Sequence, residues 1–387
     1  MVPKAFKYLA LALGLGTIHM AGLAQFSALV EYAAGLDDNI YLSPDKEGDL
    51  INDAELTLEY TLKDTATTFY YNVNYLAYSR NEERNVLLNK AGIRYIRDFG
   101  EDRQHWLYLG SYVQHRDNTD DYFYYDYLQA YAYSNFRFRI NKTFLRAGYN
   151  FRYRRYGNIM ELTNYQHYTF VQMSRSFQTR TTLLMEADWG FKSFYTSTVT
   201  TTSSTGTGNG PGGSIEYTIT EEQIPSMSHL VVLFRIAQSL HDRVGIYVQY
   251  RGQFSMNDDS WINSESFYQD EELFDDPFSY TSNGLSSRLT VILPGSLSIR
   301  AGGGIHLKDY ISEKSYTSED DYPASGDLRH DIRSNAYIRI SKTWDLKPAW
   351  IDSVNPYLNY SFVNNQSNSY WYDYNYHFLT LGVRLTF

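Results

Sequence analysis

Apolar and polar residues alternate along most of the chain after Gln25. The segment 53–62 reads DAELTLEYTL, with an apolar residue at every second position and polar residues between. Successive side chains of a strand point to opposite faces, so this pattern predicts a strand with one apolar and one polar face. The pattern then recurs, separated by polar connections, and predicts an all-β chain.

About 16 strands follow from this alternation. They are expected at 25–34, 53–62, 67–79, 85–97, 104–115, 122–140, 144–156, 162–177, 180–194, 228–240, 243–254, 282–293, 297–307, 331–342, 354–363 and 375–387. The connections between them alternate between short and long. Bacterial membrane barrels have an even number of strands, short periplasmic turns and longer external loops. We therefore expect a transmembrane antiparallel up-and-down β-barrel in the outer membrane, with both termini on the periplasmic side.

The last predicted strand carries a terminal signature. Leu381, Val383, Leu385 and Phe387 are apolar at alternate positions, and the chain stops on the aromatic residue. This segment resembles the closing strand of outer-membrane β-barrels, in which a final aromatic residue follows alternate apolar residues. The resemblance implies that these four residues are an assembly signal and that the barrel-assembly machinery is a partner.

The first 24 residues differ from the rest of the chain. Lys4 and Lys7 precede an apolar run over 8–17, and small residues at Gly22 and Ala24 flank Leu23. A charged start, a short apolar run and small residues at a cleavage site are typical of a secretory signal peptide. We expect a signal peptide at 1–24 and one barrel domain at 25–387.

Composition supports this class. The chain has 38 Tyr, 21 Phe and 6 Trp, yet its mean hydropathy is −0.46 and no run of about 20 apolar residues follows the signal. A barrel needs apolar side chains only on alternate positions, and tyrosine suits a lipid interface. A secreted β-sandwich array is the alternative. With no cysteine, disulfides and thiolate metal sites are excluded, and we expect no metal and no cofactor.

Arginine recurs at the polar positions of the predicted strands. Twelve residues share this parity: Arg94, Arg137, Arg139, Arg146, Arg152, Arg154, Arg251, Arg288, Arg300, Arg333, Arg339 and Arg384. A charge that faces lipid near the midplane costs about 2–4 kcal/mol, so these side chains should line the lumen. There they favour anionic solutes, as arginine rings do in anion pores. Alternatively, they form a structural lattice with Glu55, Glu59, Glu186 and Asp188. Acidic residues instead crowd the long connections, where we expect solvated rims.

The connection after the first strand reads GLDDNIYLSP over 35–44, with Tyr32 before it. It resembles the corresponding segment of the porin-2-like family of outer-membrane barrels, which is associated with exopolysaccharide export. The resemblance implies polysaccharide-export components as partners. Asp37, Asp38 and Asn39 could supply oxygen ligands to calcium, but a capped turn is the favoured interpretation.

No catalytic residues are predicted. His330 and Asp331 are adjacent on a strand and so point to opposite faces, and His241-Asp242 lies in a predicted turn. The leading hypothesis is a pore that passes small hydrophilic solutes or exported polysaccharide through an arginine-rich lumen. The second is a non-conducting barrel that anchors an envelope or secretion assembly. Outer-membrane lipids and lipopolysaccharide are expected partners, and nucleic acid is not.

Overall fold

The computed structural model of the chain describes residues 24–63, 65–100, 104–195, 198–206, 215–223, 226–258, 276–346 and 350–387. The expected signal peptide lies outside these residues apart from Ala24, where the first strand begins. In the described part, no helix is long and apolar enough to cross a membrane.

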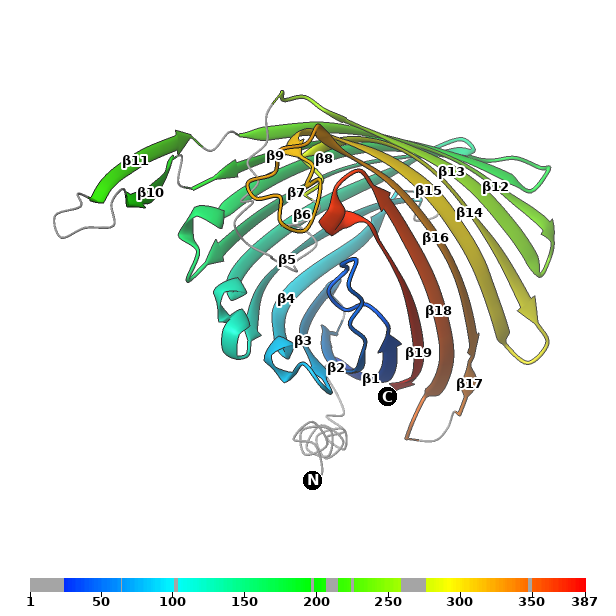
Figure 1. Cartoon of the computed structure of the whole chain (residues 1–387). Helices are drawn as coiled ribbons and strands as arrows, with labels where there is room; N and C mark the ends of the chain where they lie inside the picture. Colours follow the sequence, from blue (N-terminus) through cyan, green and yellow to red (C-terminus); the bar gives the residue numbers. More distant parts are fainter. Residues whose placement is uncertain are drawn as a thin grey trace.

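A single antiparallel sheet closes on itself (Figure 1). It has 17 strands, of which β17 (Trp344–Asp345) is a two-residue strand at a turn, so the wall has 16. Those are β1 (Ala24–Asp37), β2 (Asp49–Leu62), β3 (Thr67–Tyr78), β4 (Val86–Phe99), β5 (His105–Asn118), β6 (Tyr127–Ile140), β7 (Thr143–Tyr156), β8 (Asn164–Ser176), β9 (Thr181–Phe194), β12 (Met227–His241), β13 (Val244–Ser255), β14 (Tyr280–Leu293), β15 (Leu297–Lys314), β16 (Leu328–Lys342), β18 (Ser353–Ser367) and β19 (Tyr374–Thr386). The predicted 16-stranded antiparallel barrel is confirmed.

Neighbouring strands follow one another in sequence, and β1 closes the ring against β19. Val30 lies opposite Leu385 and Tyr32 opposite Val383, so the apolar positions of the last strand continue those of the first. Phe387 and Ala28 exchange backbone hydrogen bonds of 2.9 and 3.3 Å. The terminal signature therefore lies at the seam of the barrel, with Leu381 exposed on its outer face.

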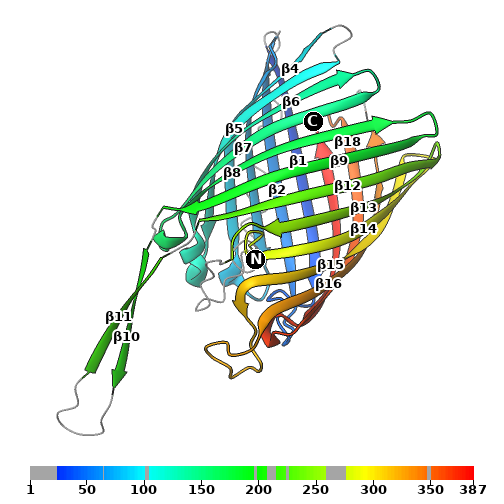
Figure 2. The ribbon, with the colours of Figure 1, turned by 90° about the horizontal axis from the view of Figure 1, so that it is seen from above.

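Short turns gather at one end of the wall and longer connections at the other (Figure 2). Both the first and the last strand have their free ends at the short-turn end. The strands have 12 to 18 residues, whereas a spanning strand needs about 9–11, so they are long enough to cross a bilayer and project beyond it.

The wall has an apolar outer face and a polar inner face. Large apolar residues at alternate positions are exposed on the outside, among them Phe69 on β3, Val171 on β8 and Leu285 on β14. Their neighbours in sequence, such as Tyr70, Gln172 and Ser286, take the opposite face. This arrangement suits hydrocarbon outside and water inside.

Two boundaries differ most from prediction. The aromatic-rich residues 122–126 do not start a strand, because Asp120–Tyr125 forms a 3-10 helix, η3. Tyr125 packs there in a buried cluster with Tyr127, Tyr156, Ile159 and Leu162. Strand β15 continues to Lys314, seven residues beyond its predicted end at Leu307.

The connection 195–225 is rich in Thr, Ser and Gly, a composition that predicts a mobile polar loop. It contains two paired strands, β10 (Thr198–Gly206) and β11 (Ile215–Gln223), which form a separate two-stranded sheet. Figures 1 and 2 show this hairpin extending away from the wall at the long-loop end.

Candidate pore lining

Strand register places all twelve predicted arginines on the inner face. Arg300 lies directly opposite Arg339, and Arg137 lies opposite Arg146. Five of them stand on β6 and β7 and five on β13 to β16, with Arg94 on β4 and Arg384 on β19. Inner carboxylates instead cluster on β1, β2 and β9: Glu31, Asp53, Glu55, Glu59, Glu186 and Asp188.

Inner aromatic side chains lie against glycines of the neighbouring strand. A Cβ on Gly110 would stand 2.2 Å from the ring of Tyr133, and one on Gly382 would stand 2.4 Å from the ring of Tyr357. The other close pairs are Gly35 with Phe378, Gly92 with Tyr70, Gly148 with Phe170, Gly190 with Tyr168 and His229, Gly284 with His306, and Gly302 with Tyr337. Only glycine leaves room for a ring at this distance. The rings therefore lie along the wall instead of projecting across the interior.

Several arginines stack on these rings. The guanidinium carbon of Arg339 is 4.2 Å from the ring centre of Tyr357, and that of Arg146 is 4.9 Å from Phe170. Arg288 donates a 2.6 Å hydrogen bond to the hydroxyl of Tyr337. Each ring thus lies on a glycine of the wall, and a guanidinium group lies on the ring. Cation–π attraction keeps the charged group close to the wall.

The described residues include one ion pair of the alternative lattice and one similar pair with another carboxylate. Arg94 pairs with Glu59 at 2.6 Å, and Arg384 pairs with Glu31 at 2.6 Å. By contrast, Glu55 accepts a 2.6 Å hydrogen bond from Asn72, and Glu186 accepts one from Gln172.

The inner arginines differ in their contact with solvent. Only Arg154 is buried, with 6% exposure, and it donates hydrogen bonds to Gln129 and Tyr156. The other eleven predicted arginines retain contact with solvent. Arg154 is therefore shielded from solvent, whereas the other eleven arginines are not.

Other inner cations were not predicted: Lys90, Arg116, Lys192, Arg235, Lys308 and Arg329. Arg235, like Arg251, stands at a polar position of an alternating strand, so the alternation could have identified it as an inner residue. Its side chain donates a hydrogen bond to Gln249 at 2.8 Å. Arg329 precedes the predicted start of its strand at Asp331, and that boundary error excluded it.

The segment Asp276–Ser279, which leads into β14, is attached to the inner wall. Phe278 is 1% exposed and stacks on His229 with ring centres 4.1 Å apart. Asp276 forms a buried ion pair with Lys192 of β9. This end of the connection is therefore fixed inside the barrel mouth, over β9 and β12.

A second buried cluster lies farther round the mouth, at β15 and β16. Arg329 bridges Glu313 at 3.1 Å and Asp331 at 2.5 Å, and its guanidinium lies 3.3 Å from the ring centre of Tyr372. Tyr372 belongs to the 3-10 helix η5 (Tyr370–Tyr372), and burial there, with the charge of Glu313, raises its pKa. The cluster thus connects β15, β16 and the last long connection.

Asp321 closes the connection 315–327 with hydrogen bonds from Thr317 and Ser325. Those from Ser325 and Thr317 lower the pKa of the carboxyl to about 2. Because the pKa in the folded protein is lowered, the hydrogen bonds to the Asp321 carboxylate contribute their full stabilisation above the ordinary pKa of 3.8. That stabilisation is lost as the pH falls through about 2. We expect amide hydrogen exchange at Thr317 and Ser325, corrected for intrinsic rates, to rise between pH 4 and 2. Asp321→Asn should remove that pH dependence, and unchanged exchange in the wild-type protein would contradict it.

The predicted turn after β1 is present. The side-chain amide of buried Asn39 donates hydrogen bonds to the backbone carbonyls of Ser43 at 2.8 Å and Asn375 at 3.1 Å. The backbone N–H of Asn39 donates to the carboxylate of Asp37. The segment therefore ties the first long connection to β19. Among the described residues, no group of three acidic, histidine or cysteine side chains is placed to hold a metal ion.

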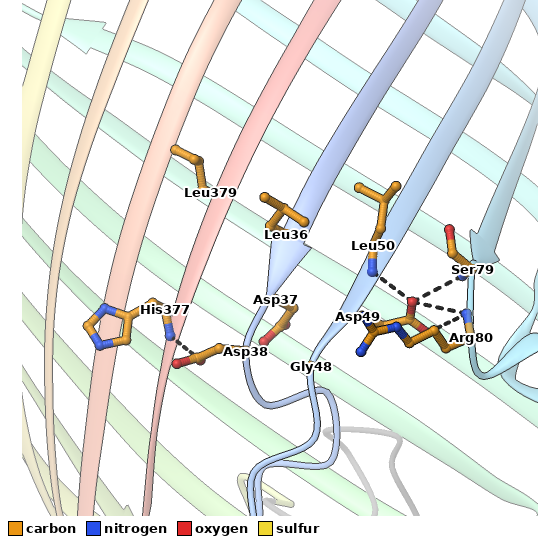
Figure 3. A pocket seen from close by; sticks show the side chains of 10 residues that line it. All are labelled: Leu36, Asp37, Asp38, Gly48, Asp49, Leu50, Ser79, Arg80, His377 and Leu379. Atoms are coloured by element: carbon orange, nitrogen blue, oxygen red, sulfur yellow. Dashed lines mark hydrogen bonds between the residues drawn. The ribbon is translucent and has the colours of Figure 1, made fainter.

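A pocket of about 460 Å³ lies on the outer face beside this turn (Figure 3). Leu36, Leu50 and Leu379 line it side by side on β1, β2 and β19, and His377 and Arg80 flank them toward the long connections. Asp49 is held there by backbone N–H groups, including those of Ser79 and Arg80. The pocket therefore joins an apolar surface to a polar rim.

Neither histidine–aspartate pair forms a dyad. His330 contacts Asp309 at 2.5 Å on the outer face, whereas Asp331 faces inward to Arg329. Asp242 pairs with Arg180 at 2.6 Å across two short turns.

Comparison with known proteins gives a fold but no family. No family model matches the chain, and no curated protein matches it. Among solved structures, OccAB1 of Acinetobacter baumannii aligns with a TM-score of 0.50 at 9% identity, over 94% of this chain and 96% of that one. The outer membrane protein opdK of Pseudomonas aeruginosa aligns at 0.48 and 10% identity, over 94% and 98%. A bacterial polysaccharide outer membrane secretin aligns at 0.47 and 11% identity, over 93% and 97%.

The likeness to OccAB1, with the closed sheet, defines the fold class. The chain has the fold of a 16-stranded outer-membrane β-barrel.

Proposed function

We propose that this chain forms a water-filled pore in a bacterial outer membrane. The observation that carries the proposal is a closed 16-stranded wall on whose inner face eleven of the twelve predicted arginines remain in contact with solvent. Barrels of this size enclose an aqueous channel unless something fills them. Glycine-seated rings and ring-stacked arginines keep side-chain volume close to the wall. The short-turn end would face the periplasm, as is usual for such barrels.

The preferred solutes would be anionic. On β13 to β16 the inner wall presents Arg251, Arg288, Arg300, Arg333 and Arg339, and no inner carboxylate of these strands faces the barrel below the mouth. A cationic wall in water attracts anions and repels cations. Aromatic faces between the guanidinium groups would suit sugar rings. Acidic sugars, alone or in an exported polysaccharide, therefore combine both features.

Solute flux into liposomes tests this proposal. We expect liposomes with the purified barrel to swell faster in isotonic glucuronate than in isotonic gluconamide, which is similar in size but neutral. Swelling at equal rates would contradict an anion preference, and no swelling in either solute would contradict a pore. Lipopolysaccharide and other outer-membrane lipids, the barrel-assembly machinery and polysaccharide-export components would be its partners.

A non-conducting anchor is the second candidate. The attachment of Asp276–Ser279 inside the mouth is the feature that favours it, because this segment occupies part of the opening. Replacing Asp276 with Asn and Phe278 with Ala should release the segment. A pore would then conduct more, whereas an anchor filled by other parts of the chain would stay closed.

A further inference from the structure

Five tyrosines on the outer face form hydrogen bonds to a polar side chain on the next strand. The pairs are Tyr32 to Asn52 at 2.8 Å, Tyr71 to Asn89 at 2.7 Å, Tyr149 to His167 at 2.6 Å, Tyr250 to Asn283 at 2.7 Å and Tyr360 to His377 at 2.8 Å. Each tyrosine is 38–41% exposed, so all five occupy a similar environment at the surface.

The five pairs share one geometry. In each, the partner lies two residues nearer the long-loop end than the residue directly opposite the tyrosine, as Asn52 does relative to Ala54. The partners also stand at the same place in their strands, three residues after the first residue of β2, β4, β8, β14 and β19. Each tyrosine therefore leans toward the long-loop end, and each pair belongs to a hairpin closed by a long connection.

The pairing leaves a hydrogen-bond donor at each position. A tyrosine hydroxyl that donates to an asparagine Oδ1 leaves the Nδ2–H groups available, and one that donates to a histidine Nδ1 leaves Nε2–H. No described residue accepts a hydrogen bond from these nitrogens of Asn52, Asn89, Asn283, His167 or His377. With the Nδ1 atoms of His167 and His377 as acceptors, the outer wall thus presents five N–H stations where its other residues are mostly apolar.

An N–H group without an acceptor is costly in hydrocarbon, so these stations need acceptors in the adjoining lipid. We propose that the five pairs form a belt that binds the acyl carbonyl oxygens of the lipid leaflet beside the long connections. The amide donors are uncharged, which suits a carbonyl. Near His377, Leu379 lies two residues nearer the short-turn end of β19 and offers an apolar contact for the acyl chain, and Arg80 lies toward the long connections, where a headgroup begins (Figure 3).

The belt rests on the proposed membrane location but not on conduction. It would fix the depth of the barrel, since moving the barrel by one residue pair would carry the five donors into hydrocarbon or lift them away from the lipid carbonyls.

The test compares lipids with and without carbonyls. The purified full-length barrel is inserted into diacyl phosphatidylglycerol–phosphatidylethanolamine liposomes and into dialkyl ether liposomes with the same headgroups and chain lengths. The thermal midpoint is read from the heat-modifiable shift on gels. We expect the wild-type midpoint to be lower in ether lipid by about 5 °C, as five hydrogen bonds of this kind would give.

The triple variant Asn52→Leu, Asn89→Leu, Asn283→Leu should lose most of the ester–ether difference. Tyr60→Phe is the matched control, because Tyr60 is 40% exposed on the outer face at the short-turn end, and should keep the full difference. Equal wild-type midpoints in the two lipids would overturn the proposal. A midpoint that instead falls only when phosphate is removed from the headgroup would assign the belt to phosphate. Failure to insert into either lipid would refute the membrane location and the belt with it.

Discussion

Replacing Arg300 and Arg339 with glutamate is expected to reverse the ion preference of the channel. The two residues are directly opposite on β15 and β16, both face inward, and both retain contact with solvent. The double variant changes the local charge by four units. If each anion loses and each cation gains about 0.7 kcal/mol near them, the anion-to-cation permeability ratio changes by about tenfold. The reversal potential under a salt gradient measures this ratio.

Two controls separate charge from shape. The lysine variant Arg300→Lys, Arg339→Lys keeps both charges and should keep the wild-type reversal potential. Arg155→Glu changes a charge on the outer parity of β7 and should also leave it unchanged. An unaltered potential in the glutamate variant would show that these arginines do not govern selectivity. Arg152 and Arg154 are poorer positions for this experiment, because Arg154 is buried in hydrogen bonds to Gln129.

The second large effect is expected at Gly110. An added Cβ would meet the ring of Tyr133, which itself donates a 2.8 Å hydrogen bond to the hydroxyl of Tyr108. Gly110→Val should push the ring of Tyr133 off the wall and into the channel. We expect a destabilisation of about 1–3 kcal/mol, typical of overpacking, and a smaller single-channel conductance. Denaturant unfolding in detergent and bilayer recording measure the two effects.

Gly245 provides the matched control. It also lies in a strand, β13, but a Cβ there would meet only a carbonyl oxygen at 3.8 Å. Gly245→Val should therefore leave conductance unchanged. The double variant Gly110→Val, Tyr133→Ala should restore the conductance, because no ring remains to be displaced. Equal losses at both glycines would contradict the role of glycine in seating the ring.

Alternation predicted the fold well because it is a local property of strands. Each of the 16 wall strands overlaps its predicted segment, and their parity holds from β1 to β19. The aromatic run at 122–125 misled the prediction, since Tyr and Phe favour strands but have no alternation there. Their packing against Tyr156 and Leu162 determines the 3-10 helix, and that contact depends on another hairpin.

The details of the lining could not be predicted, because they depend on register. The sequence shows Gly110 and Tyr133 but not that they lie opposite one another, so the seating of rings on glycines was missed. The outer pairs, such as Tyr71 with Asn89, depend on register in the same way. The ion pair between Asp276 and Lys192 joins residues far apart in sequence, so the sequence could not predict it either.

The central claim is that the closed wall surrounds continuous water. Single-channel recording of the purified chain in planar bilayers tests it most directly. We predict discrete current steps with a reversal potential that favours anions. A protein that inserts, shows the heat-modifiable shift of a folded barrel and still passes no current would contradict the claim.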